Sequence, residues 1–509
     1  MTEIPRDYNA AADLVERNLA AGRGGKTAYI DDAGHYSFAQ LAERVNRFGS
    51  GLKALGLQME DRVLLAMSDT IDWPSAFLGA IKAGIVPIAV NTLLTTKDYE
   101  YMLSDSRAKA LLVSEALLPQ FAPLLEKLPF LRHVIVSGAD AKGHTAFMEV
   151  LARGSDRLEA APTTRDDPCF WLYSSGSTGM PKGTVHVQSS MLLTAKLYAK
   201  GVLGIRESDT SFSAAKLFFA YGLGNSLSFP LAVGATTVLM AERPTPAAVF
   251  KRLTDRKPTL FYGVPTLYAA MLADAAFPKK EQLALRICVS AGEALPPPIA
   301  QTFKDKTGLD ILDGIGSTEM LHIFLSNRPG DFRHGTTGRA VPGYELRLVD
   351  EQGNNVPQGE LGELQIKGPT AANGYWNNRA KSRTTFVGEW TRSGDKYTQD
   401  KDGYYVYGGR TDDMLKVSGI WVSPAEVEAA LVSHPAVLEA AVVGQEDEQQ
   451  LVKPKAFVVL KPGAKAGDDE LKRYVKEKLA PYKYPRWIEF RAELPKTATG
   501  KIQRFKLRA

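Results

Sequence analysis

Short apolar segments recur along the chain, and each is bounded by turn-forming or charged residues. Such runs are shorter than an ordinary helix but suit a strand that is buried on both faces. We therefore predict buried strands at residues 62–67, 84–91, 110–114, 133–138, 236–241 and 286–292.

Between several of these segments the hydrophobic positions change to three- and four-residue steps. This is the spacing of one face of an α-helix. The clearest cases are residues 36–56 and 244–255. Strands that alternate with helices predict an α/β fold with largely parallel sheets, because a parallel neighbour requires a crossover connection.

The pattern changes after residue 341. Residues 346–368 predict strands joined by tight Gly/Asn turns, as in a small antiparallel or barrel-like unit. The last part combines helices at 423–433 and 468–479 with strands at 437–443 and 455–460, enough for a small α+β domain. We therefore predict a large N-terminal domain (1–411), containing two α/β subdomains and the small β-barrel-like subdomain, followed by a small C-terminal domain (412–509).

Composition narrows the class of protein. Of the 509 residues, 44% are hydrophobic and 23% charged, and the net charge is only +5. These values, without a long basic run, predict a soluble globular protein that binds neither nucleic acid nor membranes. Cys169 and Cys288 are too few for a disulfide framework and lack metal-ligand spacing. Because the N-terminus has no apolar signal segment, we expect a cytoplasmic location. We also expect a monomer or a homodimer.

Residues 173–183, YSSGSTGMPKG, have the composition of a phosphate-binding loop. A predicted strand, 169–175, leads into it. Glycines let backbone N–H groups approach an anion, the hydroxyl residues add donors, and Lys182 adds a positive charge. The Walker A pattern needs Gly-Lys-Ser/Thr, whereas Lys182 lies between Pro181 and Gly183. The order of residues therefore argues against a P-loop kinase or ATPase.

Five motifs in order resemble the adenylate-forming acyl-CoA synthetases, the family that includes luciferases and non-ribosomal adenylation domains. After the loop at 173–183 come GIGSTE (314–319), TRSGDK (391–396), YGGRTDDMLKVSG (407–419) and PKTATGKIQR (495–504). Residues 216–225 and 316–327 resemble the benzoate-CoA ligase subgroup in particular. The resemblance implies that ATP, Mg²⁺ and coenzyme A take part, and that a carboxylate is activated as an acyl-AMP.

The resemblance also implies catalytic roles. Lys501 is expected to neutralise charge at the carboxylate and α-phosphate during adenylation, since a lysine is a long, compact point charge. Thr318 is expected to hold a phosphate oxygen and Glu319 to bind Mg²⁺, a hard cation that prefers oxygen ligands. Many relatives carry Tyr where this chain has Ile315, which can cover adenine by apolar contact.

The nucleotide residues implied by the resemblance fall into three groups. The phosphate group is Ser174, Ser175, Gly176, Ser177, Thr178, Gly179 and Lys182. The adenine group is Gly292, Glu293, Ala294, Asp313, Gly314, Ile315, Gly316 and Ser317. Asp395 and Arg410 are expected at the ribose hydroxyls.

The two half-reactions are expected to use different faces of the small domain, which by resemblance rotates about Asp412. One face carries Lys501. The other face is expected to bind CoA through Lys416, Ser418, Gly419 and Lys483, with Gly419 leaving room for the pantetheine arm.

A pocket for benzoate should be flat, apolar and uncharged around the ring. By resemblance it is lined by Phe219, Ala220, Tyr221, Gly314, Gly316, His322 and Ile323, with Ala220 and Gly316 leaving a slot for the ring. The leading hypothesis is a benzoate-CoA ligase of aromatic degradation. Hydroxybenzoate, 2-aminobenzoate, coumarate or a medium-chain fatty acid remain alternative acids, and a carrier protein remains an alternative acceptor. The presence of Lys501, Glu319 and Asp395 together argues against a non-catalytic nucleotide-binding module.

Overall fold

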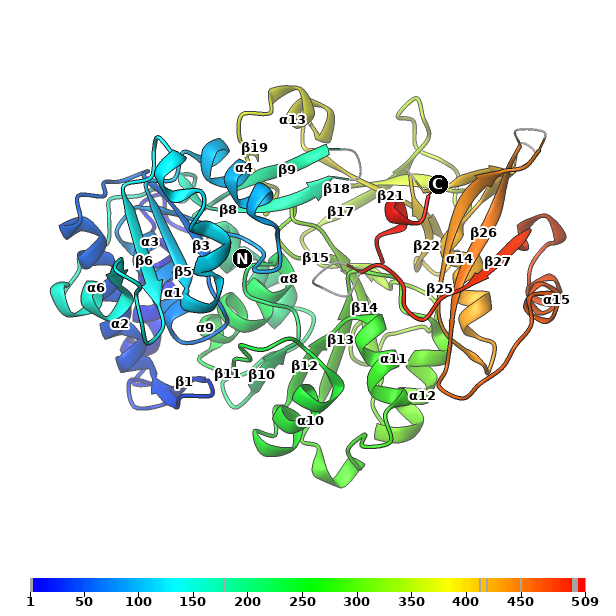
Figure 1. Cartoon of the computed structure of the whole chain (residues 1–509), viewed down its shortest axis with the longest axis horizontal. Coiled ribbons are helices and arrows are strands. Elements are labelled where there is room, and N and C mark those ends of the chain that lie inside the picture. Colours follow the sequence, from blue (N-terminus) through cyan, green and yellow to red (C-terminus); the bar gives the residue numbers. More distant parts are fainter. Residues whose placement is uncertain are drawn as a thin grey trace.

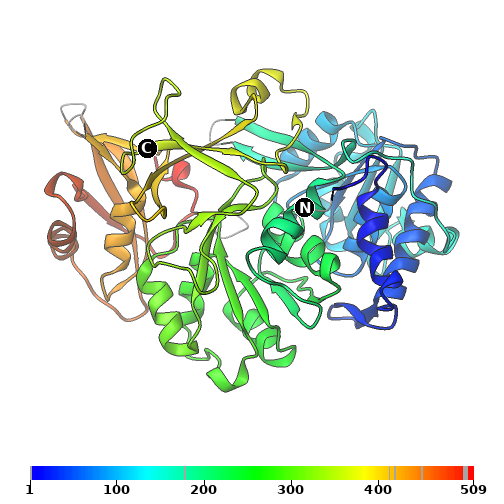
Figure 2. The ribbon, with the colours of Figure 1, turned by 180° about the vertical axis from the view of Figure 1, so that it is seen from behind.

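The structure is a computed structural model that describes residues 3–176, 179–411, 413–417, 420–448, 451–496 and 502–508. A large body holds two extended sheets and a third, smaller sheet, and the C-terminal residues form a lobe at one end (Figures 1 and 2). The mixed α/β fold class, with parallel-rich sheets and a small C-terminal unit, is confirmed.

The first sheet has eight strands, and most of its neighbouring pairs are parallel. Its order is β19 (Gly374–Tyr375), β9 (Gly179–Val187), β8 (Pro168–Gly176), β4 (Val86–Ala89), β3 (Arg62–Ala66), β5 (Ala110–Ser114), β6 (His133–Ser137) and β7 (Thr145–Ala146). The antiparallel pairs β8–β9 and β9–β19 lie at one edge.

The second sheet has nine strands, again mostly parallel. Its order is β16 (Arg339–Ala340), β15 (Ile323–Ser326), β14 (Ile311–Gly316), β13 (Ile287–Ala291), β12 (Leu260–Gly263), β10 (Thr210–Ser213), β11 (Thr236–Val238), β1 (Thr27–Ile30) and β2 (His35–Ser37). All six strands predicted from short apolar runs are present, and each lies within these two sheets.

Helices cover the two sheets. They are α1 (Ala10–Ala20), α2 (Phe38–Ala54), α3 (Asp72–Lys82), α4 (Thr96–Ser106), α5 (Leu118–Phe121), α6 (Phe147–Arg153), α7 (Ser190–Thr194), α8 (Ala220–Leu223), α9 (Phe229–Val233), α10 (Pro246–Asp255), α11 (Pro265–Ala273) and α12 (Pro297–Thr307).

Helix α2 shows how the sequence specifies these helices. Ser37 and Gln40 form a capping box: the Gln40 N–H donates to Ser37 Oγ, and the Ser37 N–H donates to Gln40 Oε1. The apolar positions Phe38, Val45 and Phe48 are fully buried. Capping and helical spacing together give the predicted helix, which begins two residues later than the predicted segment because 35–37 form β2.

The third sheet is antiparallel, as predicted for the region after residue 341. It contains β17 (Glu345–Val349), β18 (Gly362–Lys367), β21 (Trp390–Gln399) and β20 (Phe386–Val387), with β22 (Tyr405–Arg410) paired to β21. Helix α13 (Arg379–Thr385) lies between β19 and β20 in the chain.

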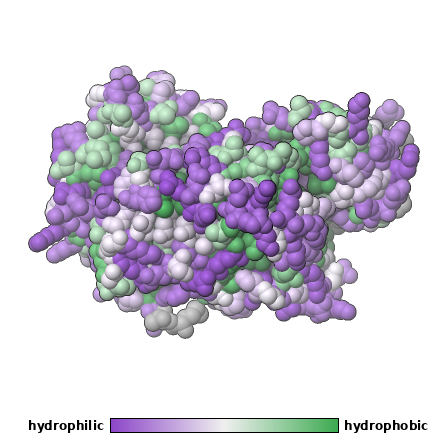
Figure 3. All heavy atoms as spheres, turned by 90° about the horizontal axis from the view of Figure 1, so that it is seen from below, coloured by the Kyte–Doolittle hydropathy of each residue, from purple (hydrophilic) through white to green (hydrophobic). Residues whose placement is uncertain are grey.

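The C-terminal lobe is built on a three-stranded sheet. Its strands are β25 (Val437–Glu446), β26 (Val452–Leu460) and β27 (Trp487–Phe490), beside the ribbon of β23 (Leu415–Val417) and β24 (Ile420–Val422). Helices α14 (Pro424–Val432) and α15 (Asp468–Lys478) agree with the two predicted helices. In Figure 3 a notch sets this lobe, on the right, apart from the body. Among the described helices, none is long and apolar enough to cross a membrane.

Candidate active site

The predicted phosphate loop is the tip of a hairpin formed by β8 and β9. Ser174 pairs with Lys182 and Gly176 with Gly179. Ser177 and Thr178 lie outside the described residues, as does the side chain of Ser175. The Ser174 Oγ is buried and has no hydrogen-bond partner among the described residues, so it can donate to a bound oxygen. Gly183 lies inside β9, paired with Tyr173, and so is not at the turn.

Lys182 and Glu319 meet at a third side chain, Tyr375. The Tyr375 hydroxyl donates to Glu319 Oε1 at 2.7 Å, and the Lys182 Nζ lies 4.8 Å from the centre of the Tyr375 ring. Burial lowers the pKa of Lys182, and the nearby Glu319 carboxylate opposes that change. The structure therefore brings together the predicted phosphate lysine and the predicted metal carboxylate.

The Thr318–Glu319 turn is also held from β9. The His186 Nε2–H donates to the Thr318 carbonyl at 2.7 Å. Burial lowers the pKa of His186 to about 4, so the ring is neutral at pH 7 and this proton fixes its tautomer. His186 thus connects the phosphate hairpin to the backbone of the predicted catalytic threonine.

Asp395 and Arg410 lie opposite each other on β21 and β22. The Arg410 Nη1 donates to Asp395 Oδ1 at 3.2 Å and to the Ser393 carbonyl at 3.1 Å. Asp395 is buried, whereas Arg410 is half-buried. The positive charge of Arg410 is close enough to Lys182 to act, after burial, in lowering the pKa of that lysine. The predicted ribose pair therefore adjoins the phosphate hairpin.

The predicted adenine residues lie at the carboxyl ends of β13 and β14, where a sheet of this kind places ligands. Ala291 pairs with Gly314, and Gly292 follows with φ +97°, a conformation that glycine adopts readily. Burial raises the pKa of Asp313 well above its usual range. Ile315, Gly316 and Ser317 are half-buried, while Gly292 and Ala294 are exposed.

The predicted acyl residues form a wall that is partly buried. Burial lowers the pKa of His322 to about 3, and its Nε2–H lies 3.2 Å from both the Tyr221 carbonyl and Asn225 Oδ1. Tyr221 donates to the Val289 carbonyl at 3.3 Å, and burial raises its pKa well above 10. Both side chains are therefore neutral at pH 7. Ile323 is fully buried, and Phe219 and Ala220 are half-buried.

The glycines of this wall serve close packing rather than the expected slot. A Cβ on Gly316 would lie 2.6 Å from the His322 carbonyl group. On Gly224, the first residue of the π-helix Gly224–Ser228, it would lie 2.3 Å from the His322 ring. The expectation that Gly316 leaves a gap of ring thickness is therefore wrong, because the backbone of β15 fills that space.

The small lobe approaches the adenine residues through its C-terminal segment. The Ile502 N–H donates to Glu293 Oε1 at 2.9 Å, and a bridge joins Lys496 to Ile502. The predicted catalytic Lys501 precedes Ile502 in the sequence and lies outside the described residues. The same is true of Asp412, Ser418 and Gly419, and of the Lys416 side chain. Lys483 forms an ion pair with Glu426 at 2.6 Å.

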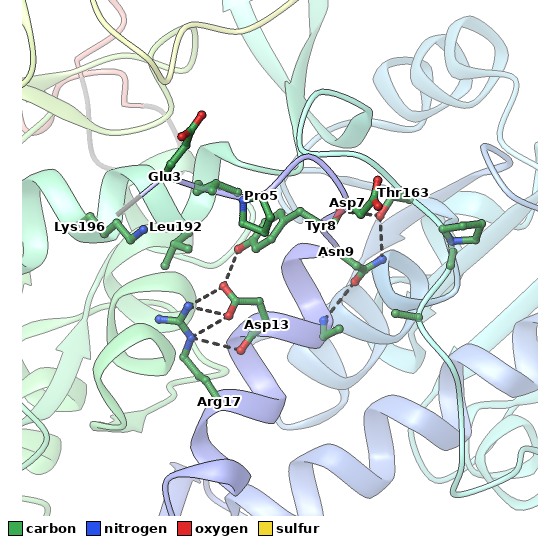
Figure 4. A pocket seen from close by; sticks show the side chains of 15 residues that line it. Glu3, Pro5, Asp7, Tyr8, Asn9, Asp13, Arg17, Thr163, Leu192 and Lys196 are labelled. Atoms are coloured by element: carbon green, nitrogen blue, oxygen red, sulfur yellow. Dashed lines mark hydrogen bonds and ion pairs between the residues drawn. The ribbon is translucent and has the colours of Figure 1, made fainter. Parts of the chain in front are cut away.

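A separate cleft of about 440 Å³ lies between the N-terminal segment and α1 (Figure 4). There the Tyr8 hydroxyl donates to Asp13 Oδ2 at 2.7 Å, and Arg17 forms an ion pair with the same carboxylate. None of the described residues predicted for the site lines this cleft.

Two family models match the chain. The model for AMP-binding enzymes matches residues 16–376, and the model for the AMP-binding enzyme C-terminal domain matches residues 426–501. The chain belongs to the AMP-binding enzyme family.

Other members align with this AMP-binding enzyme from end to end. A benzoate–CoA ligase of Thauera aromatica is 65% identical, and the alignment covers 100% of this chain and 97% of the relative. A 4-hydroxybenzoate–CoA/benzoate–CoA ligase of Rhodopseudomonas palustris is 51% identical, with 99% and 94% covered. A crystal structure of an anthranilate CoA ligase in complex with anthranoyl-AMP superposes with a TM-score of 0.95 at 47% identity, covering 99% of this chain and 97% of the other. The family resemblance of the motifs is confirmed.

The residues present fit a magnesium ion bound through nucleotide. Among the described residues, no cluster of three His, Cys, Asp or Glu side chains could hold a metal by itself. Mg²⁺ in such enzymes is usually held by one or two carboxylates and by substrate phosphates. The Glu319 carboxylate meets that requirement, because among the described residues only its Oε1 accepts a hydrogen bond, from Tyr375, and Oε2 remains for a metal ion.

Three residues of this AMP-binding enzyme were not anticipated from the sequence. They are His186, Tyr375 and Asp69, whose carboxylate accepts the Leu217 N–H at 3.2 Å just before the acyl wall. His186 lies four residues after Lys182 in the sequence. This closeness to the phosphate loop is a signal that could have marked it as a site residue. Tyr375 and Asp69 lie far from the motifs in sequence and become visible only in the folded chain.

Proposed function

We propose that this AMP-binding enzyme is an ATP-dependent benzoate–CoA ligase. A benzoate oxygen attacks the α-phosphate of ATP, which forms benzoyl-AMP and releases pyrophosphate. The sulfur of CoA then attacks the benzoyl carbonyl carbon, and the bond from that carbon to the AMP oxygen breaks to give benzoyl-CoA and AMP. The first step is needed because a carboxylate oxygen is a very poor leaving group.

The observation that carries the proposal is that a charged end and a neutral end adjoin at the segment between β14 and β15, which carries both Glu319 and His322. Lys182 of β9 lies near Glu319 at the charged end, and Tyr221 of α8 meets His322 at the other end, where both side chains are neutral. Burying a benzene ring of ~150 Å² at ~25 cal/mol/Å² contributes about 4 kcal/mol, which favours an aryl acid over acetate. The names of the full-length relatives support benzoate in particular.

At the charged end, the chain's own groups bind and orient the triphosphate. Ser174, Lys182 and Thr318, with the loop residues 175–179, are proposed to hold phosphate oxygens, and Glu319 to hold Mg²⁺. When bound, the ion neutralises charge on the phosphates. Asp395 and Arg410 are proposed at the ribose, and Asp313 with residues 292–294 and 314–317 at adenine.

Lys501 is proposed to supply positive charge at the α-phosphate during adenylation. The hydrogen bond from the neighbouring Ile502 to Glu293 supports this, since it holds the C-terminal segment against an adenine residue. The lobe 412–509 is proposed to rotate about Asp412 between the two steps. Lys416, Ser418 and Gly419 then face CoA, and Lys483 would have to leave Glu426 to meet a CoA phosphate.

The proposal is tested by measuring pyrophosphate release with benzoate, 3- and 4-hydroxybenzoate, 2-aminobenzoate and short fatty acids. We expect benzoate to give the highest kcat/KM, and the fatty acids to be poor. An apolar pocket rejects an added hydroxyl by only about a hundredfold, so ring-substituted acids should retain measurable rates. A higher kcat/KM for any other acid would replace benzoate as the substrate, and turnover only with a carrier protein would replace CoA as the acceptor.

A further inference from the structure

The backbone of Tyr375 is held in place by strand pairing and by a hydrogen bond to a neighbouring helix. It belongs to β19 and pairs with Thr184 of β9, the strand that also carries Lys182. Its N–H donates to Ser382 Oγ at 2.9 Å, which ties it to α13. Only 7% of the residue is exposed, so the ring has little freedom to move.

The hydroxyl of Tyr375 contacts the proposed metal carboxylate. It donates to Glu319 Oε1 at 2.7 Å, the length of a charge-assisted hydrogen bond. The Glu319 backbone is held as well, because its carbonyl accepts the Ala372 N–H at 2.8 Å. One carboxylate oxygen is thus anchored through a rigid side chain.

The ring of Tyr375 contacts the proposed phosphate lysine. The Lys182 Nζ lies 4.8 Å from the ring centre, within the range of a cation–π contact. Lys182 thus contacts the ring while Glu319 contacts the hydroxyl of the same tyrosine. Within the part of the chain that the structure describes, no ion pair joins Lys182 to Glu319, although the two charges are close enough to influence each other.

We propose that Tyr375 is a positioning residue that presents a cation and an anion to the metal–triphosphate at the same time. Its hydroxyl orients Glu319 toward the metal, and its ring holds Lys182 for the phosphates without allowing a Lys182–Glu319 ion pair. The inference rests on the proposed function, since it takes Glu319 as the metal ligand.

Two variants separate the two contacts. Tyr375→Phe removes only the hydroxyl, and Tyr375→Leu removes the ring too. ATP binding is measured by calorimetry without carboxylate substrate, once in EDTA and once with Mn²⁺ as the probe. For Tyr375→Phe we expect the affinity for ATP in EDTA to be unchanged. Adding Mn²⁺ should also raise the affinity of this variant for ATP, but by a factor about fivefold smaller than in the unsubstituted enzyme. For Tyr375→Leu we expect a severalfold loss in EDTA as well.

Tyr8→Phe is the matched control, because Tyr8 also donates to a carboxylate at 2.7 Å and is 8% exposed, but its partner is Asp13 on α1 (Figure 4). It should behave as the unsubstituted enzyme does. If Tyr375→Phe also does so, the proposal is wrong. If Glu319→Gln keeps the full effect of Mn²⁺, the metal assignment itself fails. Should Tyr375→Leu not fold, the single-atom change in Tyr375→Phe decides alone.

Discussion

The two ends of the active site are built in opposite ways. At the phosphate end, half-buried charged groups, Lys182, Glu319 and Arg410, come from three separate strands or turns and retain contact with solvent. At the acyl end, the buried His322 and the half-buried Tyr221 are neutral and hydrogen-bonded to backbone. The groups proposed to meet ATP are thus charged and in contact with solvent, whereas the groups proposed to recognise a flat ring are uncharged.

The largest effect should come from the residue proposed to link the two ends. Lys501→Ala is expected to lower the rate of adenylate formation by about 10²–10³-fold, because one preorganised charge at the reacting phosphate is removed. Conversion of supplied benzoyl-AMP and CoA to thioester should stay within about twofold. Lys506→Ala, a nearby described lysine, is the control. Equal loss of both half-reactions would contradict the division between them.

A side chain that crowds the acyl end should raise KM for benzoate but not KM for ATP. In Gly224→Ala the new Cβ meets the His322 ring at 2.3 Å, and that ring is buried and cannot swing away. Overpacking costs about 2 kcal/mol, so KM for benzoate should rise about thirtyfold while KM for ATP changes little. Gly25→Ala, with no atom within 4 Å of the new Cβ, is the control. A similar rise in both KM values would erase the contrast between the ends.

The neutrality of the acyl end predicts a pH effect on stability. The pKa of His322 is about 3 in the folded chain and 6.5 when unfolded, so its neutral form stabilises the fold above pH 6.5. That contribution is lost as the pH falls from 6.5 towards 3, by about 1.4 kcal/mol at pH 5.5. In thermal unfolding at pH 7.5 and 5.5, His322→Gln should therefore lose less stability than the unsubstituted chain. Parallel losses would show that His322 is not held neutral.

The smallest effect is expected where the lobe touches the adenine residues. Glu293→Gln keeps an acceptor for the Ile502 N–H but removes its charge, which should weaken the contact by about 1 kcal/mol. Adenylate formation should fall about fivefold, with thioester formation from benzoyl-AMP unchanged. A rise in the rate of adenylate formation would mean that this contact restrains the first step.

The two ends also differ in how far the sequence could predict them. Ser174, Lys182, Glu319 and Asp395 lie in short motifs, so their chemistry follows from local order, as does the capping of α2 by Ser37. Tyr375 lies 56 residues from Glu319 and meets it only because β19 pairs with β9. The sequence predicts open space beside Gly316, but the pairing of β14 with β15 places the backbone of His322 and Ile323 there.

The two ends are proposed to meet so that a benzoate oxygen attacks the α-phosphate of ATP. This step can be followed by mass spectrometry of the products formed from benzoate labelled with ¹⁸O in its carboxylate, together with ATP, Mg²⁺ and CoA. We expect one ¹⁸O in AMP for each benzoyl-CoA formed. Label in inorganic phosphate, with ADP in place of AMP, would contradict it.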